Sequence, residues 1–375
     1  MFAAIGVCAG AVVLTWIFLP HVLLGVSIER CDMRDSVESK AECWDGILRR
    51  DMKENGLASA FTVVKRMYDG YPDFVNGAGG CHERGHSLGA AAYLEFYLAG
   101  EKQEDLKTFV PDIDLCSWGF FHSFTGHLFT EHPDPAFVAE TCASVREHLV
   151  PPLSEHALNS HCFHGAGNGF MSTQLEGVTV PKIQRLDSFF AKPYELCNAI
   201  PGIAEKGVQD CINGIFAAFF YVYLPSLQDK DPDKNFENMF SICGGLRHEF
   251  RAACYFPVGF RLTSVAHGDP RLLAQRIMES TPDEEMRARA FEGGMVTMSE
   301  MQVITNPNAP RELFAACKEL PQNFWGPCAA GIARGISFNT IAPHAGVDPQ
   351  ALIFCSSPDV AALGVSDSCL AFSSE

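Results

Sequence analysis

The sequence lacks the charge pattern of a nucleic-acid-binding protein. Its 28 Lys and Arg residues form no basic run, and the formal net charge is −17. Binding to phosphates needs clustered positive charge, so this distribution argues against nucleic acid as a partner. The excess of acidic residues mainly favours solubility.

Several catalytic and structural motifs are also missing. The chain has no G-x-S-x-G nucleophile elbow, no P-loop, no G-x-G-x-x-G after a strand and no C-x-x-C-H. No alternating apolar and polar runs flank a turn in the manner of a β-hairpin. No long stretch has the polar, low-complexity composition of a disordered segment, and 47% of the residues are hydrophobic. We therefore expect a chain that is folded throughout and built from helices.

The N-terminal segment is one apolar run. The first charged residue after the N-terminus is Glu29, and residues 2–28 are long enough to cross a bilayer as a helix. The run has no basic residue before it and no clear A-x-A cleavage site, which favours an uncleaved anchor over a cleaved signal peptide. The predicted organisation is a transmembrane anchor over residues 1–28 and an extracytoplasmic helical domain over residues 29–375.

Cysteine indicates an oxidising compartment, either the periplasm or the cell exterior. Cys8 lies inside the apolar run, which leaves fourteen other cysteines, an even number. Five pairs are close neighbours along the chain, as expected for local disulfides: Cys31/Cys43, Cys197/Cys211, Cys243/Cys254, Cys317/Cys328 and Cys355/Cys369. Cys142 and Cys162 make a further predicted pair. Cys81 and Cys116 form either a longer disulfide or a pair of thiolate metal ligands.

A repeated pattern surrounds these cysteines. "CSWGFFHSFTG" from Cys116, "CFHGAGNGFM" from Cys162, "CINGIFAAFF" from Cys211 and "CAAGIARGIS" from Cys328 all have Gly three residues after Cys. Between the copies stands an apolar segment that ends in Cys, as in "FVAETC" and "RELFAAC". The unit is a helix, a loop closed by a disulfide, and a Gly-rich helix. This pattern predicts an all-α array of about seven or eight αα-hairpins, curved as a solenoid or closed as a toroid. Its small residues suit close backbone approach, so the Gly-rich helices are expected on the inner side.

Histidine is concentrated in one part of the chain. Nine of the 13 histidines lie between positions 82 and 164, and six are predicted near the starts of Gly-rich helices. Those six are His82, His86, His122, His127, His161 and His164. Consecutive repeats bring such helix starts together, and neutral imidazole is a favoured ligand of zinc and copper, so the six are candidate metal ligands. The alternative is that they act as buried hydrogen-bonding spacers.

One pair of these histidines belongs to a known motif. His82-Glu83-x-x-His86 has the spacing that places two zinc ligands and a general base on one helix. With Gly89 the stretch resembles the zinc-peptidase group of metzincins, but Ala92 stands where that group has its third histidine. The resemblance implies a zinc hydrolase with Glu83 as the base, and the departure at Ala92 weakens it.

Together these features favour a membrane-anchored, extracytoplasmic helical-repeat protein that acts as a binding or scaffold protein with a His-lined zinc or copper site. Its expected partners are the membrane, through residues 2–28, and other proteins. Two alternatives remain open. One is a structural subunit of a larger membrane complex, and the other is a zinc-dependent hydrolase that uses Glu83. A role without catalysis is favoured, because a fold does not by itself imply a function.

Overall fold

The computed structural model describes residues 27–71, 74, 80–97, 118–148, 155–178, 186–227, 232–266, 268–303, 306–338 and 349–374. The anchor predicted over residues 1–28 lies almost wholly outside these ranges. Within them, no helix combines the length and the apolar character that crossing a bilayer requires.

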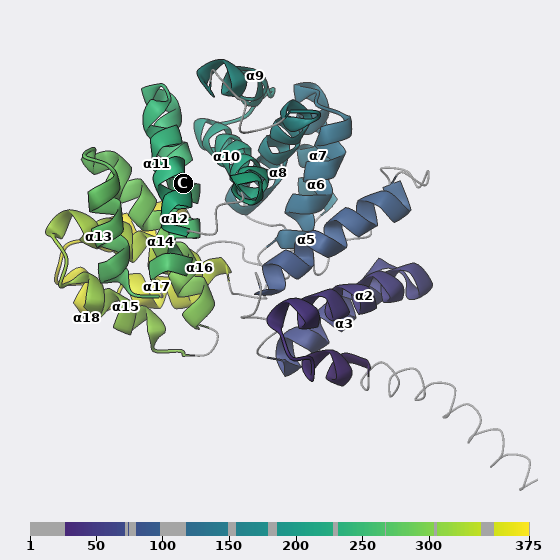
Figure 1. The fold of residues 1–375 in the computed structure, drawn as a ribbon, viewed down its shortest axis with the longest axis horizontal. Coiled ribbons are helices and arrows are strands. Elements are labelled where there is room, and N and C mark those ends of the chain that lie inside the picture. Colours follow the sequence, from purple (N-terminus) through teal and green to yellow (C-terminus); the bar gives the residue numbers. More distant parts are fainter. Residues whose placement is uncertain are drawn as a thin grey trace, which may run out of the picture.

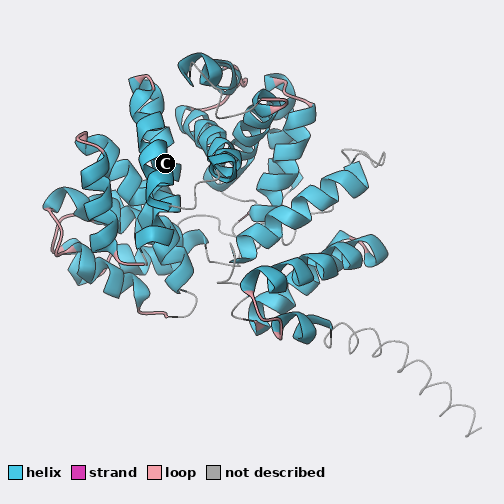
Figure 2. Ribbon diagram, viewed as in Figure 1, coloured by secondary structure: helices cyan, strands magenta, loops and turns pink. Residues whose placement is uncertain are grey.

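The described part of the chain is all-helical and contains no strand, as the sequence predicts (Figure 2). A π-helical segment (Tyr93–Tyr97) directly follows α5. The α-helices are α2 (Val37–Asn55), α3 (Leu57–Gly70), α5 (Gly80–Ala92), α6 (Gly119–Glu131), α7 (Pro135–His148), α8 (Glu155–Leu175), α9 (Leu186–Asn198), α10 (Glu205–Leu227), α11 (Pro232–Gly245), α12 (His248–Ala266), α13 (Pro270–Ser280), α14 (Glu284–Val303), α15 (Ala309–Cys317), α16 (Trp325–Phe338), α17 (Pro349–Cys355), α18 (Pro358–Ala361) and α19 (Ser366–Ser374).

The Gly-rich helices pack against one another in chain order. Helix α5 contacts α6, and the contacts continue through α8, α10, α12, α14 and α16. In Figure 1 the helices from α5 to α10 lie on one side of the molecule, and those from α12 to α17 lie on the other. At the N-terminal end, α2 contacts both α3 and α5. From α6 to α16 the Gly-rich helices alternate along the chain with the other helices, and each of those packs beside the Gly-rich helix that follows it.

Disulfides join neighbouring helices. The six short pairs predicted from sequence are all disulfides: Cys31–Cys43, Cys142–Cys162, Cys197–Cys211, Cys243–Cys254, Cys317–Cys328 and Cys355–Cys369. Cys31–Cys43 joins the helical residues before α2 to α2, and the other five link α7 to α8, α9 to α10, α11 to α12, α15 to α16 and α17 to α19. Each closes a short loop, which stabilises the fold by about 3 kcal/mol in the chain-entropy model.

The α13–α14 pair has no disulfide, as its lack of cysteine predicts. Arg287 instead ties the two helices together, because its guanidinium donates to the carbonyl oxygens of Thr281 at 2.6 Å and Met278 at 3.2 Å. The side chain of Leu273 packs directly against Gly294. Hydrogen bonds and apolar contact therefore join α13 to α14, where other helix pairs are joined by a disulfide.

The glycines of the repeated pattern lie where neighbouring backbones meet. A Cβ atom at Gly119 would overlap the carbonyl oxygen of His82, one at Gly214 would overlap that of His164, and one at Gly331 would fall 2.6 Å from that of Glu292. These positions confirm that the small residues allow close helix approach. Gly costs about 1 kcal/mol relative to Ala inside a helix, which the tight packing and the disulfides offset.

Candidate metal centre

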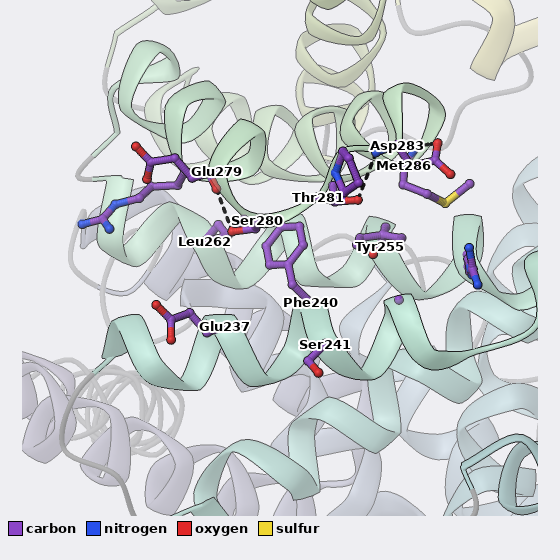
Figure 3. A pocket seen from close by; sticks show the side chains of 14 residues that line it. Glu237, Phe240, Ser241, Tyr255, Leu262, Glu279, Ser280, Thr281, Asp283 and Met286 are labelled. Carbon is purple, nitrogen blue, oxygen red and sulfur yellow. Dashed lines mark hydrogen bonds between the residues drawn. The ribbon is translucent and has the colours of Figure 1, made fainter.

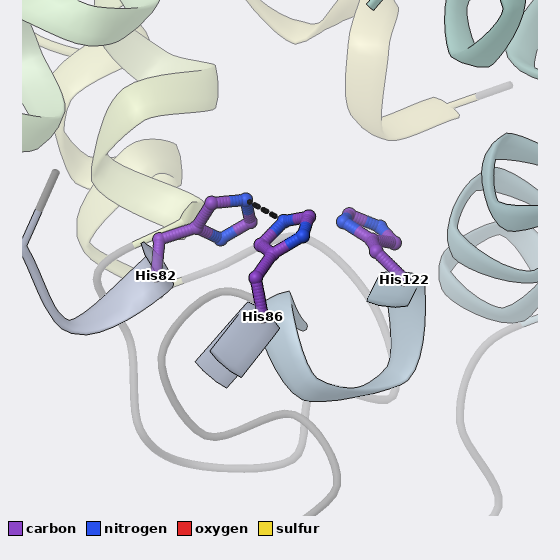
Figure 4. Close-up of side chains that lie close together, drawn as sticks. All are labelled: His82, His86 and His122. Atoms are coloured by element: carbon purple, nitrogen blue, oxygen red, sulfur yellow. Dashed lines mark hydrogen bonds between the residues drawn. The ribbon is translucent and has the colours of Figure 1, made fainter. Parts of the chain in front are cut away.

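Two of the candidate ligands occupy the first turns of α5. His82 and His86 are separated by one helical turn and therefore share a face, and their Nε2 atoms are 3.0 Å apart (Figure 4). Both rings are half-buried. Two nitrogens bound to one tetrahedral zinc ion at about 2.0–2.1 Å lie about 3.3 Å apart. This pair is therefore close to the separation that a shared ion requires.

The third candidate ligand comes from α6. His122 is buried in the first turn of that helix, and its ring centroid is 5.7 Å from that of His82 and 6.1 Å from that of His86. One donor nitrogen from each of the three rings can be chosen so that all three lie within 4.8 Å of one another. Contact of α5 and α6 at Gly119 brings these rings together, because a larger residue would separate the helices.

Two further predicted ligands extend the cluster. From α8, the Nδ1 atom of His161 lies 2.7 Å from Nε2 of His122, and the ring of His164 is 4.8 Å from that of His122. Because α8 begins at Glu155, His161 and His164 lie beyond its first turn, which differs from the predicted placement near a helix start.

His127 lies to one side of the other five. Its exposed ring stacks on that of Tyr93, with the ring centroids 5.7 Å apart, and its charge lowers the pKa of His86. The structure thus groups His82, His86, His122, His161 and His164 by direct ring contacts, with His127 at the margin.

The opposite face of α5 is bound to α2. The carboxylate of Asp45 forms an ion pair with Arg84 at 3.1 Å and accepts a hydrogen bond from the Ser87 hydroxyl at 3.0 Å. Burial raises the pKa of Asp45, although Arg84 and the Ser87 hydrogen bond lower it, and the charge of Glu83 adds a small increase. Glu83 therefore lies within electrostatic reach of Asp45.

Burial keeps the imidazoles of His86, His122 and His164 neutral at neutral pH. It lowers the pKa of His86 and of His122 well below the ordinary value, and nearby histidines lower both further. The pKa of His164 falls to about 3, first because of burial and then because of His82 and Arg334. Neutral imidazole is the form that coordinates a metal ion, so these shifts favour binding.

Charged groups from the C-terminal helices act on the cluster. Arg261 of α12 lowers the pKa of His86, and His82 acts on Glu300 of α14, a carboxyl group whose pKa is raised by burial. Sequence reasoning missed these residues, because nothing in their local spacing links them to histidines so distant along the chain.

The side chain of Arg334, which lowers the pKa of His164, is held in place by its neighbours. Glu292 pairs with Arg289 at 2.7 Å and approaches Arg334 at 4.0 Å. Both guanidiniums lie over the ring of Phe256, at 5.3 Å and 4.9 Å. This network holds the side chain of Arg334 at the fixed position from which it acts on His164.

A separate hollow of about 750 Å³ lies between α11, α12 and the α13–α14 turn (Figure 3). Buried apolar side chains and charges of both signs line it, and no sequence motif pointed to it. The lining residues are Glu237, Phe240, Ser241, Gly244, Arg251, Tyr255, Leu262, Arg276, Glu279, Ser280, Thr281, Pro282, Asp283 and Met286. None of the described residues that line it is a histidine or a cysteine.

Cys81 is not a thiolate ligand, because it is disulfide-bonded. Its predicted partner Cys116 lies outside the described residues. The disulfides indicate an oxidising, extracellular type of environment.

Fold and site together define a disulfide-rich, all-helical domain with a three-histidine cluster suited to a metal ion. Comparison with known proteins adds no family, because no family model, curated protein or solved structure matches the chain.

Proposed function

We propose that this protein is an extracytoplasmic helical-repeat scaffold that binds one transition-metal ion, zinc or copper, through His82, His86 and His122. The observation that carries the proposal is the approach of three imidazole nitrogens, from two separate helices, to within 4.8 Å of one another. Neutral nitrogen ligands suit zinc and copper better than magnesium or calcium, which prefer oxygen.

The repeat architecture supports the scaffold role. The same glycine contact recurs between successive Gly-rich helices, at Gly119, Gly214 and Gly331, and a disulfide recurs between a Gly-rich helix and its neighbour. We propose that these units form a curved array of stacked αα-hairpins, which presents an extended surface to a protein partner. The apolar run at residues 2–28 would tether that surface to a membrane.

A zinc hydrolase is the second candidate, and the small number of ligands favours it. Three protein ligands leave one coordination position for water or substrate, as in catalytic zinc sites. The departure from the metzincin pattern at Ala92 weakens the case for Glu83 as the base. We therefore rank binding above hydrolysis.

The direct test is titration of the metal-free protein with Zn²⁺ and with Cu²⁺. Single His82→Ala, His86→Ala and His122→Ala variants should each lose at least about tenfold in affinity, since each removes a ligand. His248→Ala, at the start of α12 and exposed to solvent, is the matched control and should bind as the original protein does. Equal affinity in all four variants would refute the site.

A further inference from the structure

His122 and His161 are in direct contact within the histidine cluster. The Nε2 atom of His122 lies 2.7 Å from Nδ1 of His161, which is hydrogen-bond distance. Both side chains are 8% exposed, so water does not readily replace this bond. One of the two nitrogens must carry the proton and the other must accept it, because two N–H groups facing each other would repel.

We propose that His161 is a positioning residue for the metal ion: it accepts the Nε2–H of His122 and so leaves Nδ1 of His122 to face the ion. The inference rests on the proposed metal site and assigns the coordinating atom within it. A histidine that binds a metal usually donates its other ring N–H to a fixed acceptor, which sets its tautomer and ring orientation. His161 supplies that acceptor.

Trp118 fixes His161 in turn. Its indole stacks on the His161 ring with centroids 4.4 Å apart and planes 12° from parallel. Among the described residues, Trp118 is the one non-glycine residue with a positive φ, at 65°. Strained backbone of this kind is often found at functional sites.

The same residue also starts the helix that carries His122. The carbonyl oxygen of Trp118 accepts a hydrogen bond from the backbone N–H of His122 at 2.9 Å. Trp118 therefore sets the position of the donor through its backbone and the position of the acceptor through its ring. The two halves of the His122–His161 bond are thus held by one residue.

Two variants of His161 separate its hydrogen bond from its packing. His161→Phe keeps a ring to stack on Trp118 but has no acceptor, whereas His161→Gln keeps an acceptor without the aromatic ring. Co²⁺ serves as the probe, because its visible absorption reports the geometry of its ligands. We expect His161→Phe to weaken Co²⁺ binding by about 10–100-fold and to change the absorption spectrum, and His161→Gln to lose less.

Two results would overturn the assignment. Binding within about twofold of the original protein, with an unchanged spectrum in a folded His161→Phe variant, would show that His161 positions nothing. Loss of more than about 100-fold in a folded His161→Phe variant, or no detectable Co²⁺ binding, would show that His161 is itself a ligand. Thermal unfolding of the metal-free variants identifies any that fail to fold, in which case His161→Gln alone decides.

Nitrogen NMR of the histidine-labelled, metal-free protein tests the bond without metal. The expected result is a proton on Nε2 of His122 and a bare Nδ1; a proton on Nδ1 would contradict the assignment. If the original protein binds no Co²⁺ but shows this tautomer, the proposed metal site is refuted and the proposed hydrogen bond is supported. If it binds Co²⁺ and His161→Phe changes nothing, only the positioning role fails.

Discussion

The Cα atom of Gly119 lies against the backbone carbonyl of His82, so closely that a Cβ atom at position 119 would overlap the oxygen. This contact joins α5 to α6 at the level of the histidine cluster. It makes the spacing of the candidate ligands a consequence of backbone packing. A glycine with no ligand atom of its own therefore determines whether His82 and His122 can reach one ion.

Replacing Gly119 by Ala should destabilise the fold and weaken metal binding together. The added methyl group must push α5 from α6, and overpacking of this kind typically costs about 1–3 kcal/mol. The control is Gly46→Ala in α2, where a Cβ atom would meet nothing within 4 Å. That change should leave stability equal or raise it by up to about 1 kcal/mol. Chemical unfolding measures both, and equal effects would refute the packing argument.

The cysteines should be almost fully oxidised in the native protein. Six disulfides are described and Cys81 is bonded as well, so Cys8 is the one thiol that the predicted pairing leaves free. Alkylation under denaturing conditions without reductant, followed by mass spectrometry, should therefore label about one cysteine. Labelling of nearly all fourteen others would contradict both the compartment and the architecture.

Acid should destabilise the metal-free protein through its buried histidines. The pKa of His164 is about 3 in the folded protein against 6.5 ordinarily, so between these values the unfolded chain binds more protons than the folded one. Stability then falls as the pH falls, by at most about 1.4 kcal/mol per pH unit for each such histidine. His164→Gln should show a shallower loss of melting temperature between pH 7 and pH 5. Parallel curves would show that His164 does not carry the effect.

Replacement of Glu83 by Gln should leave metal affinity within about twofold of the original. The reason is that Glu83 is not one of the three proposed ligands, His82, His86 and His122. Metal titration provides the measurement, and a hydrolase assay on the same variant adds a second readout. A tenfold loss of affinity would place Glu83 at the ion. Loss of a hydrolytic activity with metal retained would favour the zinc hydrolase.

Much of the fold follows from local sequence signals. The short disulfides could be predicted because each closes a loop between neighbouring helices, as at Cys317–Cys328, and because close spacing makes such pairing economical. The close approach at Gly119, Gly214 and Gly331 follows from their shared distance from cysteine. These features depend on contacts between adjacent units, which the chain order already specifies.

The candidate site was only partly predictable. The gathering of His82, His86, His122, His161 and His164 follows from successive helices packing side by side. The surroundings of the cluster do not follow from the order of the helices, because they depend on contacts between distant parts of the chain. Arg261 acts on His86, and His82 acts on Glu300, across the fold, and no local spacing indicates that these groups lie close together. The stacking of Trp118 on His161 likewise requires the actual path of the chain.

The most direct measurement is the metal content of the protein after expression in an oxidising compartment and purification without chelator. The account predicts about one equivalent of zinc or copper per chain, and loss of that metal from a folded variant in which His82, His86 and His122 are all replaced by Ala. Less than about half an equivalent of any transition metal in the original protein, or unchanged content in the triple variant, would contradict it.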